Sequence, residues 1–319
     1  IFDLYSMFEI TPYTLEQKLR WNDFVRRSKN STFLHNRDYM DYHADRFDDA
    51  SLLVWQKGRL VALLPFNRGA DGRVVSHGGL TYGGLLLDNR ATVENVCEMF
   101  VQINKSLKSM GVVGVIYKPV PQIYHLMPAE EDLYAIFNCC NARLVRREIS
   151  STIAQQMPIR FAESRQSGLR KARNMGISIQ QSTNYAAFWD ILSKNLADRY
   201  NTVPVHSLAE ICRLAEAFPA NIKLYMAYQN EMPLSGTVVY ETPQVVHTQY
   251  ISASPIGKQL GALDLLFHRL VREVYKDVPY FDFGTSTIDG GNGLNPSLIF
   301  QKEGFGGRGI CYDTYEWDL

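Results

Sequence analysis

The chain has 319 residues, 46% of which are hydrophobic, and its 33 basic residues balance its 33 acidic residues. A net charge of zero excludes a chain-wide electrostatic grip on nucleic acid, so we expect no DNA partner. The apolar runs are too short to cross a bilayer and the first ten residues lack the basic region of a signal peptide. The cysteine and histidine spacings fit neither a disulfide framework nor a metal site. We therefore expect a cytoplasmic protein with no membrane insertion and no metal.

The predicted elements follow one order in the first half of the chain and the same order again in the second. Each half has two helices, a hairpin with a polar tip, a long amphipathic helix and a buried strand. Sequence identity between the halves is weak, so the repeat rests on order and spacing. It predicts an α/β fold (α+β mixed sheets) in two domains from an internal duplication, over 1–156 and 157–319. The paired segments are the helices 14–28 and 184–200, the helices 35–47 and 207–218, the hairpins 51–66 and 223–240, the long helices 91–110 and 258–275, and the strands 112–120 and 278–286.

The most informative segment lies in the second half, from residue 247 to residue 306. A strand leads into a helix whose start carries Gly257 and Gly261. We expect uncovered backbone N–H groups there, and these groups together with the helix dipole favour an anion. Asp282 and Ser286 follow at the carboxyl end of the next strand, the usual location of ligand-facing groups in α/β sheets. This combination is typical of a group-transfer site.

Several stretches resemble one known family. They are the basic helix with its closing glycine over 167–176, the helix start over 261–266, Phe-Asp-Phe-Gly over 281–284, and Lys-x-x-Phe-Gly over 302–306. In this order they resemble the tandem branch of the GNAT superfamily, which holds the Fem peptidoglycan-bridge aminoacyltransferases and the BioF2-like acetyltransferases. The resemblance covers essentially the whole chain. It departs from the strict GNAT acyl-CoA loop, because the glycines after the central strand fall at other intervals.

The resemblance implies an N-acyltransferase that moves an acyl or aminoacyl group to an amine, with small-molecule substrates. The implied acceptor is an amino sugar or a cell-envelope precursor. The implied donor is acyl-CoA, such as acetyl-CoA, or aminoacyl-tRNA. Neutral charge and the lack of a long charged helical-hairpin insertion favour acyl-CoA, whereas the altered glycine spacing favours aminoacyl-tRNA. The same altered loop keeps a rival class open, a non-catalytic ligand-binding protein on a duplicated GNAT scaffold.

Three residues are candidates for the chemistry of acyl transfer. Lys302 is expected to stabilise negative charge on the donor phosphate or on the tetrahedral oxyanion, and its alternative is a solvated loop lysine. Asp282 is expected to act as general base or to orient substrate, because its apolar neighbours favour a raised pKa. The alternative for Asp282 is a turn carboxylate. Tyr250 is expected to be a general acid for the leaving group, with a core tyrosine as the alternative.

The remaining candidates bind substrate rather than react with it. A basic helix and a glycine-rich loop over 75–85 are each expected to contact the acceptor, but a solvated helix face and a glycine bulge explain them as well. His247 and Tyr250 are expected to face opposite sides of their strand, and a hydrogen-bonded core histidine is the simpler reading of His247. The predicted donor-binding residues are Gly257, Gly261, Ala262 and Ser286, and the predicted acceptor-binding residues are Arg170, His77, Tyr82 and His247.

Overall fold

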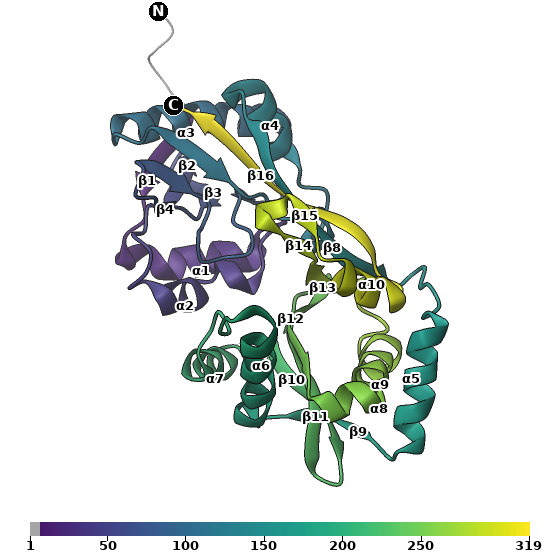
Figure 1. The fold of residues 1–319 in the computed structure, drawn as a ribbon. Helices are drawn as coiled ribbons and strands as arrows, with labels where there is room; N and C mark the ends of the chain where they lie inside the picture. The colour runs from purple at the N-terminus through teal and green to yellow at the C-terminus, as the bar shows by residue number, and fades with distance from the viewer. Residues whose placement is uncertain (1–6) are drawn as a thin grey trace, which may run out of the picture. The chain divides into compact units, whose positions relative to one another are not determined.

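The computed structural model describes residues 7–319 (Figure 1). These residues form two compact units. Unit 1 comprises the described residues up to Glu148 together with Gly290–Asn292 and Cys311–Leu319, and unit 2 comprises Ile149–Asp289 and Gly293–Ile310. The compact units thus divide after Glu148, whereas the boundary of the repeat, expected between residues 156 and 157, stays a prediction.

Unit 1 is built from strands that are mostly antiparallel, apart from the parallel pair of β5 with β7, and one long helix packs on them. The helix Val93–Ser109 (α3) has its apolar residues three and four positions apart, so Val96, Phe100, Ile103 and Leu107 share one buried face. One sheet has the order β1 (Glu9–Pro12), β2 (Leu52–Gln56), β3 (Arg59–Leu64), β6 (Leu86–Leu87). The other strands of unit 1 lie outside this sheet and follow the order β4 (Asn67–Arg68), β5 (Arg73–Val75), β7 (Gly114–Tyr117), β16 (Arg308–Asp318). Its other helices are η1 (Leu15–Gln17), α1 (Lys18–Arg27), η2 (Phe33–His35), α2 (Arg37–Met40), η3 (Asp41–His43), η4 (Gln122–Tyr124) and α4 (Glu131–Cys140).

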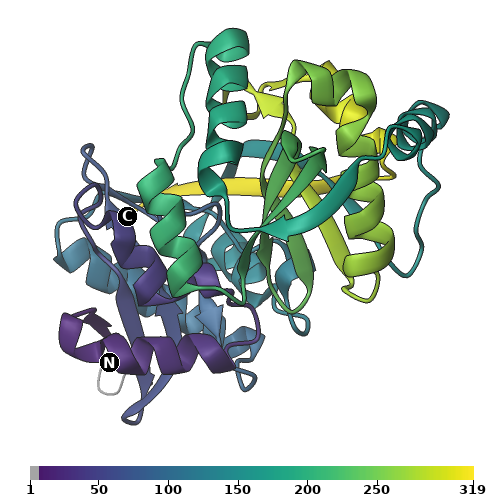
Figure 2. The ribbon, with the colours of Figure 1, turned by 90° about the horizontal axis from the view of Figure 1, so that it is seen from below.

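Unit 2 is a mixed sheet with helices on both faces, and Figure 2 shows its green central strands between the teal and the yellow-green helices. The strand order is β8 (Arg143–Ala154), β13 (Tyr280–Thr285), β12 (Val245–Ala253), β11 (Met232–Glu241), β10 (Ile222–Gln229), β9 (Ser178–Ser182). Separately, β14 (Thr287–Ile288) pairs with β15 (Gly293–Leu294). Its helices are α5 (Glu163–Asn174), α6 (Tyr185–Tyr200), α7 (Leu208–Ala217), α8 (Pro255–Leu260), α9 (Ala262–Arg269), η5 (Leu270–Val274) and α10 (Pro296–Gly304), and η6 (Asp289–Gly291) follows β14.

The two faces of the unit 2 sheet are covered by different helices. α9 and η5 pack their apolar residues against Val246 and Phe281 in one aromatic-rich core. α6 packs on β11 and β12 from the other face, where the ring of Trp189 meets that of Tyr250 at 5.2 Å. The sheet therefore stands between α6 and α9, and any opening between its strands connects the two helix layers.

β12 and β13 are parallel neighbours that stay together for only three residue pairs. The pairs are Val245↔Tyr280, Val246↔Phe281 and His247↔Asp282. β12 continues to Ala253 and remains paired with β11 on its other edge. Beyond His247, the described part of β12 has no further partner on β13, so the two strands separate there. The separation leaves backbone groups of β12 without a sheet partner, and such groups need another partner or a ligand.

A β-bulge in β12 changes which side chains share a face. Tyr240 pairs with His247 and Val238 pairs with Tyr250, while Val239 pairs with Thr248, so Gln249 is the extra residue. Because Tyr240 and Val238 lie two positions apart on β11, their partners lie on the same face. The expectation that His247 and Tyr250 face opposite ways is therefore wrong.

Three predicted helices differ from the structure. The spacing of Leu15, Leu19 and Phe24 predicts a helix over 14–28 that has these residues on one face. The segment is helical and Phe24 is buried beside Trp21 and Val25, but Leu15 and Leu19 are exposed. The segment 35–47 holds only the short turns α2 and η3. The predicted helix 258–275 is interrupted at Gly261, whose φ of 74° lies in the left-handed region. The remaining paired helices, hairpins and strands are present near their predicted bounds.

Gly261 also explains Gly168, the glycine in the middle of α5. A Cβ on Gly261 would overlap the backbone of Gly168, and a Cβ on Gly168 would overlap the carboxylate of Asp264. The two glycines thus allow α5 to approach the junction of α8 and α9 closely. Arg165 of α5 completes the contact, because its guanidinium binds Asp264 at 3.0 Å.

Candidate active site

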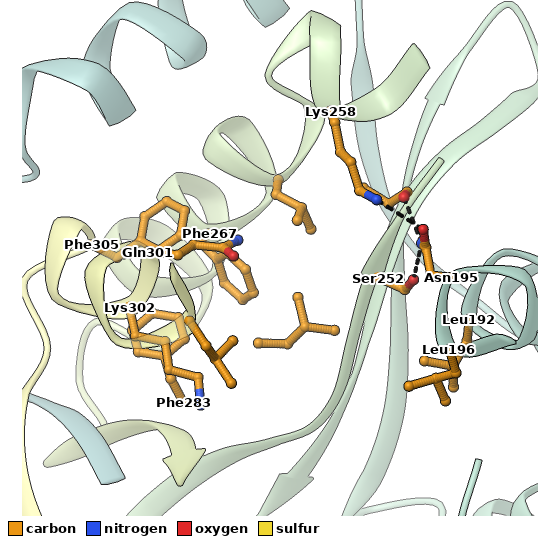
Figure 3. A pocket seen from close by; sticks show the side chains of 14 residues that line it. Leu192, Asn195, Leu196, Ser252, Lys258, Phe267, Phe283, Gln301, Lys302 and Phe305 are labelled. Carbon is orange, nitrogen blue, oxygen red and sulfur yellow. Dashed lines mark hydrogen bonds between the residues drawn. The ribbon is translucent and has the colours of Figure 1, made fainter. Parts of the chain in front are cut away.

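A cavity of about 210 Å³ lies in unit 2 where β12 and β13 separate (Figure 3). Because α6 and α9 lie on opposite faces of the sheet and both contribute side chains, the cavity extends through the opening between the two strands. Its wall is mostly apolar, with a lysine from α8 and a lysine from α10. The lining residues are Leu192, Asn195, Leu196, Ile251, Ser252, Ala253, Lys258, Leu263, Phe267, Phe283, Leu298, Gln301, Lys302 and Phe305.

Lys302 is buried at the β13 side of this cavity. Its Nζ donates hydrogen bonds to the carbonyl oxygens of Gly284 at 2.8 Å and Thr285 at 2.7 Å. An ammonium group carries three N–H donors, so one donor is left for a ligand. Burial lowers the pKa of Lys302 to about 8, against a smaller opposite effect of the Asp282 carboxylate. Lys302 is thus a buried cation in an apolar wall, not a solvated loop lysine.

Asp282 is fully buried and its carboxylate is held by three side chains. It accepts hydrogen bonds from Ser150 Oγ, from Thr152 Oγ1 at 2.7 Å and from His247 Nδ1 at 2.7 Å. Burial alone raises the pKa of Asp282, but the hydrogen bonds and the charge of His247 together lower it below its ordinary value. The expected rise in this pKa is therefore wrong in direction. The carboxylate faces protein donors, and Asp282 is not among the residues that line the cavity.

Asn195 and Lys258 form the other polar end of the cavity (Figure 3). The side chain of Asn195 donates to Ser252 Oγ at 2.6 Å and to the carbonyl of Ala253 at 2.7 Å, and its Oδ1 accepts from Lys258 Nζ at 2.8 Å. Asn195 therefore fixes the end of β12 and positions an exposed cation beside it. No short-range motif marks Asn195, because it lies more than fifty residues before the groups that it contacts.

The predicted donor-binding residues serve mainly to build the backbone. The N–H of Gly257 is already bound by Ser254 Oγ at 3.0 Å, so it is not the uncovered donor that we expected. A side chain there would also overlap the carbonyl of Leu234. Ala262 is completely buried. The buried Oγ of Ser286 has no hydrogen-bond partner among the described residues, and it does not line the cavity.

Tyr250 lies on the α6 face but outside the cavity wall. Its hydroxyl accepts a hydrogen bond from the backbone N–H of His206 at 3.2 Å and donates to His206 Nδ1 at 2.5 Å. Burial raises the pKa of Tyr250 to about 12. The phenol thus fixes the loop between α6 and α7, in a position different from that expected of a general acid.

The structure does not bring the predicted acceptor residues of the first half into the cavity. His77 is buried in unit 1, stacked on His43 at 5.3 Å, and burial lowers the pKa of His77 to about 3. Tyr82 is also buried, and its hydroxyl donates to Thr32 Oγ1 at 3.2 Å. Arg170 of α5 is exposed and forms an ion pair with Glu163 at 2.6 Å. Within unit 2, a hydrogen bond joins His247 to Asp282, and Lys302 binds the carbonyl of Gly284, two residues after Asp282.

Two features are absent from the described residues, 7–319. No group of three or more metal-ligating side chains is present among them. Within the same range, no helix is both long enough and apolar enough to span a membrane.

Comparisons with known proteins agree with the predicted resemblance. The family model for the acetyltransferase (GNAT) domain matches residues 163–292. FemX has a similar structure over 98% of this chain and 97% of its own, with a TM-score of 0.67 and 10% identity. L-PGS from Bacillus licheniformis is similar over 95% and 91%, with a TM-score of 0.61 and 10% identity. A tandem GNAT protein from the clavulanic acid biosynthesis pathway is similar over 98% of both chains, with a TM-score of 0.50 and 10% identity. No curated protein sequence matches the chain.

Proposed function

Because residues 163–292 are a GNAT acetyltransferase domain, in a chain with the fold of the Fem-like tandem GNAT proteins, we propose that the enzyme transfers the acyl group of an acyl-CoA to an amine. The mixed α/β fold and the N-acyltransferase class agree with the sequence-based predictions. The choice of donor and acceptor and the roles of single residues are part of the proposal.

The observation that carries the proposal is the cavity at the separation of β12 and β13. An acyl thioester joined to a flexible arm is mostly apolar, and so is the cavity wall that includes Leu196, Phe267 and Phe283. Lys258 at one end suits the phosphates of the donor, because a lysine is a point charge that binds phosphate. Lys302 at the other end suits the thioester carbonyl, where negative charge develops during attack. These assignments give the donor a direction through the domain.

The chemistry then requires an amine, an activated carbonyl and a departing thiolate. The amine nitrogen forms a bond to the thioester carbon, and the remaining N–H of Lys302 stabilises the oxyanion of the tetrahedral intermediate. Collapse of this intermediate breaks the C–S bond and releases the thiolate. For the acceptor, we propose a small-molecule amine of the class that the sequence resemblance implies, an amino sugar or a cell-envelope precursor.

Aminoacyl-tRNA is the second candidate donor. The observation in its favour is that the N–H of Gly257, expected to be uncovered and to bind an anionic part of the donor, is occupied by Ser254. Lys258 is then the only cation among the cavity residues at that end. Titration with both donor classes separates these alternatives.

The decisive experiment is calorimetric titration with acetyl-CoA, decanoyl-CoA and an aminoacyl-tRNA. We expect acyl-CoA to bind the wild type, and Leu196→Trp to weaken this binding at least tenfold because the indole fills the cavity. Leu19→Trp is the matched control, because Leu19 is exposed on α1, which does not line the cavity. Thermal unfolding verifies that both variants fold. Acyl-CoA affinity that Leu196→Trp leaves unchanged would place the donor elsewhere, and binding of aminoacyl-tRNA alone would overturn the choice of donor.

A further inference from the structure

A row of polar side chains crosses the unit 2 sheet at the point where β12 and β13 separate. Thr152, Asp282, His247 and Tyr240 are register partners on four adjacent strands, so their side chains share one face. This is the face that carries α6, opposite the apolar core formed with α9. His247 and Asp282 form the last parallel pair before the two strands separate, so the polar row crosses the sheet where the opening begins.

The hydrogen bonds of Asp282 determine the state of the His247 ring. A carboxylate with a lowered pKa is an acceptor, so Nδ1 of His247 carries the proton of the 2.7 Å contact. In the neutral ring Nε2 then carries a lone pair. No donor to this nitrogen is found among the described residues, and the side chain keeps 16% of its surface exposed. Asp282 is completely shielded and already accepts from Ser150 and Thr152. The hydrogen bond to Asp282 therefore fixes the orientation of the imidazole ring, and Nε2 remains as a basic nitrogen.

The backbone of Gly284 links His247 to the cavity. Gly284 has a φ of 74°, and a Cβ there would lie 3.1 Å from Cε1 of the His247 ring. The carbonyl of the same residue accepts the hydrogen bond from Lys302, which lines the cavity. Imidazole and ammonium group therefore lie on either side of one peptide segment. His247 itself does not line the cavity, so the proposal that follows places the acceptor amine on the α6 face, between Nε2 and a thioester carbonyl beside Lys302.

We propose that His247 is the general base of acyl transfer and that Asp282 is its positioning residue, an inference that rests on the proposed function. Nε2 takes one proton from the acceptor ammonium, which frees the nitrogen lone pair for attack on the thioester carbon. When the C–S bond breaks, the second proton leaves the nitrogen and goes to the departing thiolate. The products are the amide, the free thiol and imidazolium, which returns its proton to solvent. Asp282 holds the tautomer and stabilises the imidazolium, as a buried carboxylate does beside a catalytic histidine.

The variant that tests this role is His247→Asn. The asparagine amide keeps a donor for Asp282 but has no group at the position of Nε2. With acetyl-CoA as donor and glucosamine heading a panel of amines, we expect turnover near neutral pH to fall about 100-fold or more. Acetyl-CoA affinity and thermal stability should stay close to the wild-type values. His268→Asn is the matched control, because His268 is a half-buried histidine of α9 outside the cavity, near Glu273 at 3.7 Å.

The pH dependence distinguishes a base from a structural histidine. Above the pKa of the acceptor amine no base is needed to free its nitrogen, so the ratio of wild-type to variant turnover should shrink towards one. Asp282, which binds His247, and Lys302, which binds the Gly284 carbonyl beside the ring, are charged groups that both proteins retain. Turnover within threefold of the wild type overturns the proposal, and so does a loss that is equal at every pH. Absence of acyl-CoA binding to the wild type would instead refute the proposed function.

A measurement on unsubstituted His247 covers the case in which the variant does not fold. Carbethoxylation of the His268→Asn protein, followed by mass spectrometry, assigns the loss of activity to a peptide. We expect activity to decline with modification of the peptide that carries His247, and bound acyl-CoA to slow both. Full activity after modification of His247 refutes the proposal.

Discussion

The charge of Lys302 can be tested through the stability of the protein alone, with the variant Lys302→Met, which keeps the stem and removes the ammonium group. Burial lowers the pKa of Lys302 from an ordinary value of 10.5 to about 8. Between these two values the unfolded chain binds more protons than the folded protein. The free energy of unfolding of the wild type therefore rises with pH across this window. At about 1.36 kcal/mol for each pKa unit, the full window is worth about 3 kcal/mol, of which about 2 kcal/mol falls between pH 7 and pH 9.5.

Urea unfolding of both proteins at several pH values measures this difference. The wild type should gain about 2 kcal/mol relative to Lys302→Met between pH 7 and pH 9.5. Lys258→Met is the matched control, because it removes the charge of an exposed lysine at the other end of the cavity. The control therefore distinguishes the effect of burying a lysine from the effect of losing its charge. A difference between wild type and Lys302→Met that stays flat within 0.5 kcal/mol, about a quarter of the expected gain, would show that Lys302 is not held as a desolvated cation.

Three further predictions follow from the same contacts. Activity of the wild type should fall above about pH 8 as Lys302 loses its proton, and Lys302→Arg, whose guanidinium stays charged, should move this limb to higher pH in a pH–rate profile. Gly168→Ala should destabilise unit 2 by about 1–3 kcal/mol in urea unfolding, because its methyl group overlaps the Asp264 carboxylate, whereas Ser167→Ala on the exposed side of α5 should change stability little. Asn195→Ala should weaken acyl-CoA binding in calorimetry, since it releases both the end of β12 and Lys258, and unchanged affinity would remove Asn195 from the site.

The sequence predicted the elements of unit 2 better than their contacts. Local patterns identified the strands on either side of α8 and α9, and the family resemblance identified Lys302. Neither one encodes register, so the separation of β12 from β13 after His247↔Asp282 was beyond prediction. The bulge at Gln249 has the same cause, because it is defined by the partner strand β11. A period of two residues counted along β12 alone therefore placed Tyr250 on the wrong face.

Asp282 shows a second limit of reading sequence locally. Its neighbours in the chain are phenylalanines, which favour a raised pKa, but its neighbours in space are Ser150, Thr152 and His247. The first two lie about 130 residues earlier on β8, and no short motif connects them to the aspartate. Gly168 and Gly261 show the same limit, because the atoms that leave no room for a side chain belong to the other segment: the Asp264 carboxylate for Gly168 and the Gly168 backbone for Gly261. Helix spacing failed in unit 1 for a related reason, since Leu15 and Leu19 have the right period but no surface to pack against.

The last strand, β16, has a consequence for the order in which the protein matures on the ribosome. Its residues 315–318 pair with β7 at 114–117, and Trp317 is buried against Phe100 and Tyr117. The N-terminus of a nascent chain leaves the ribosome first, so about two hundred further residues must be synthesised after β7 before β16 is available to pair with it. Unit 2, which contains the cavity and His247, runs from Ile149 to Ile310 without Gly290–Asn292, so it needs no residue of β16 beyond Ile310. The half of the enzyme that is translated first is therefore the half that is finished last, and until then Tyr117 and Phe100 lack the indole that covers them.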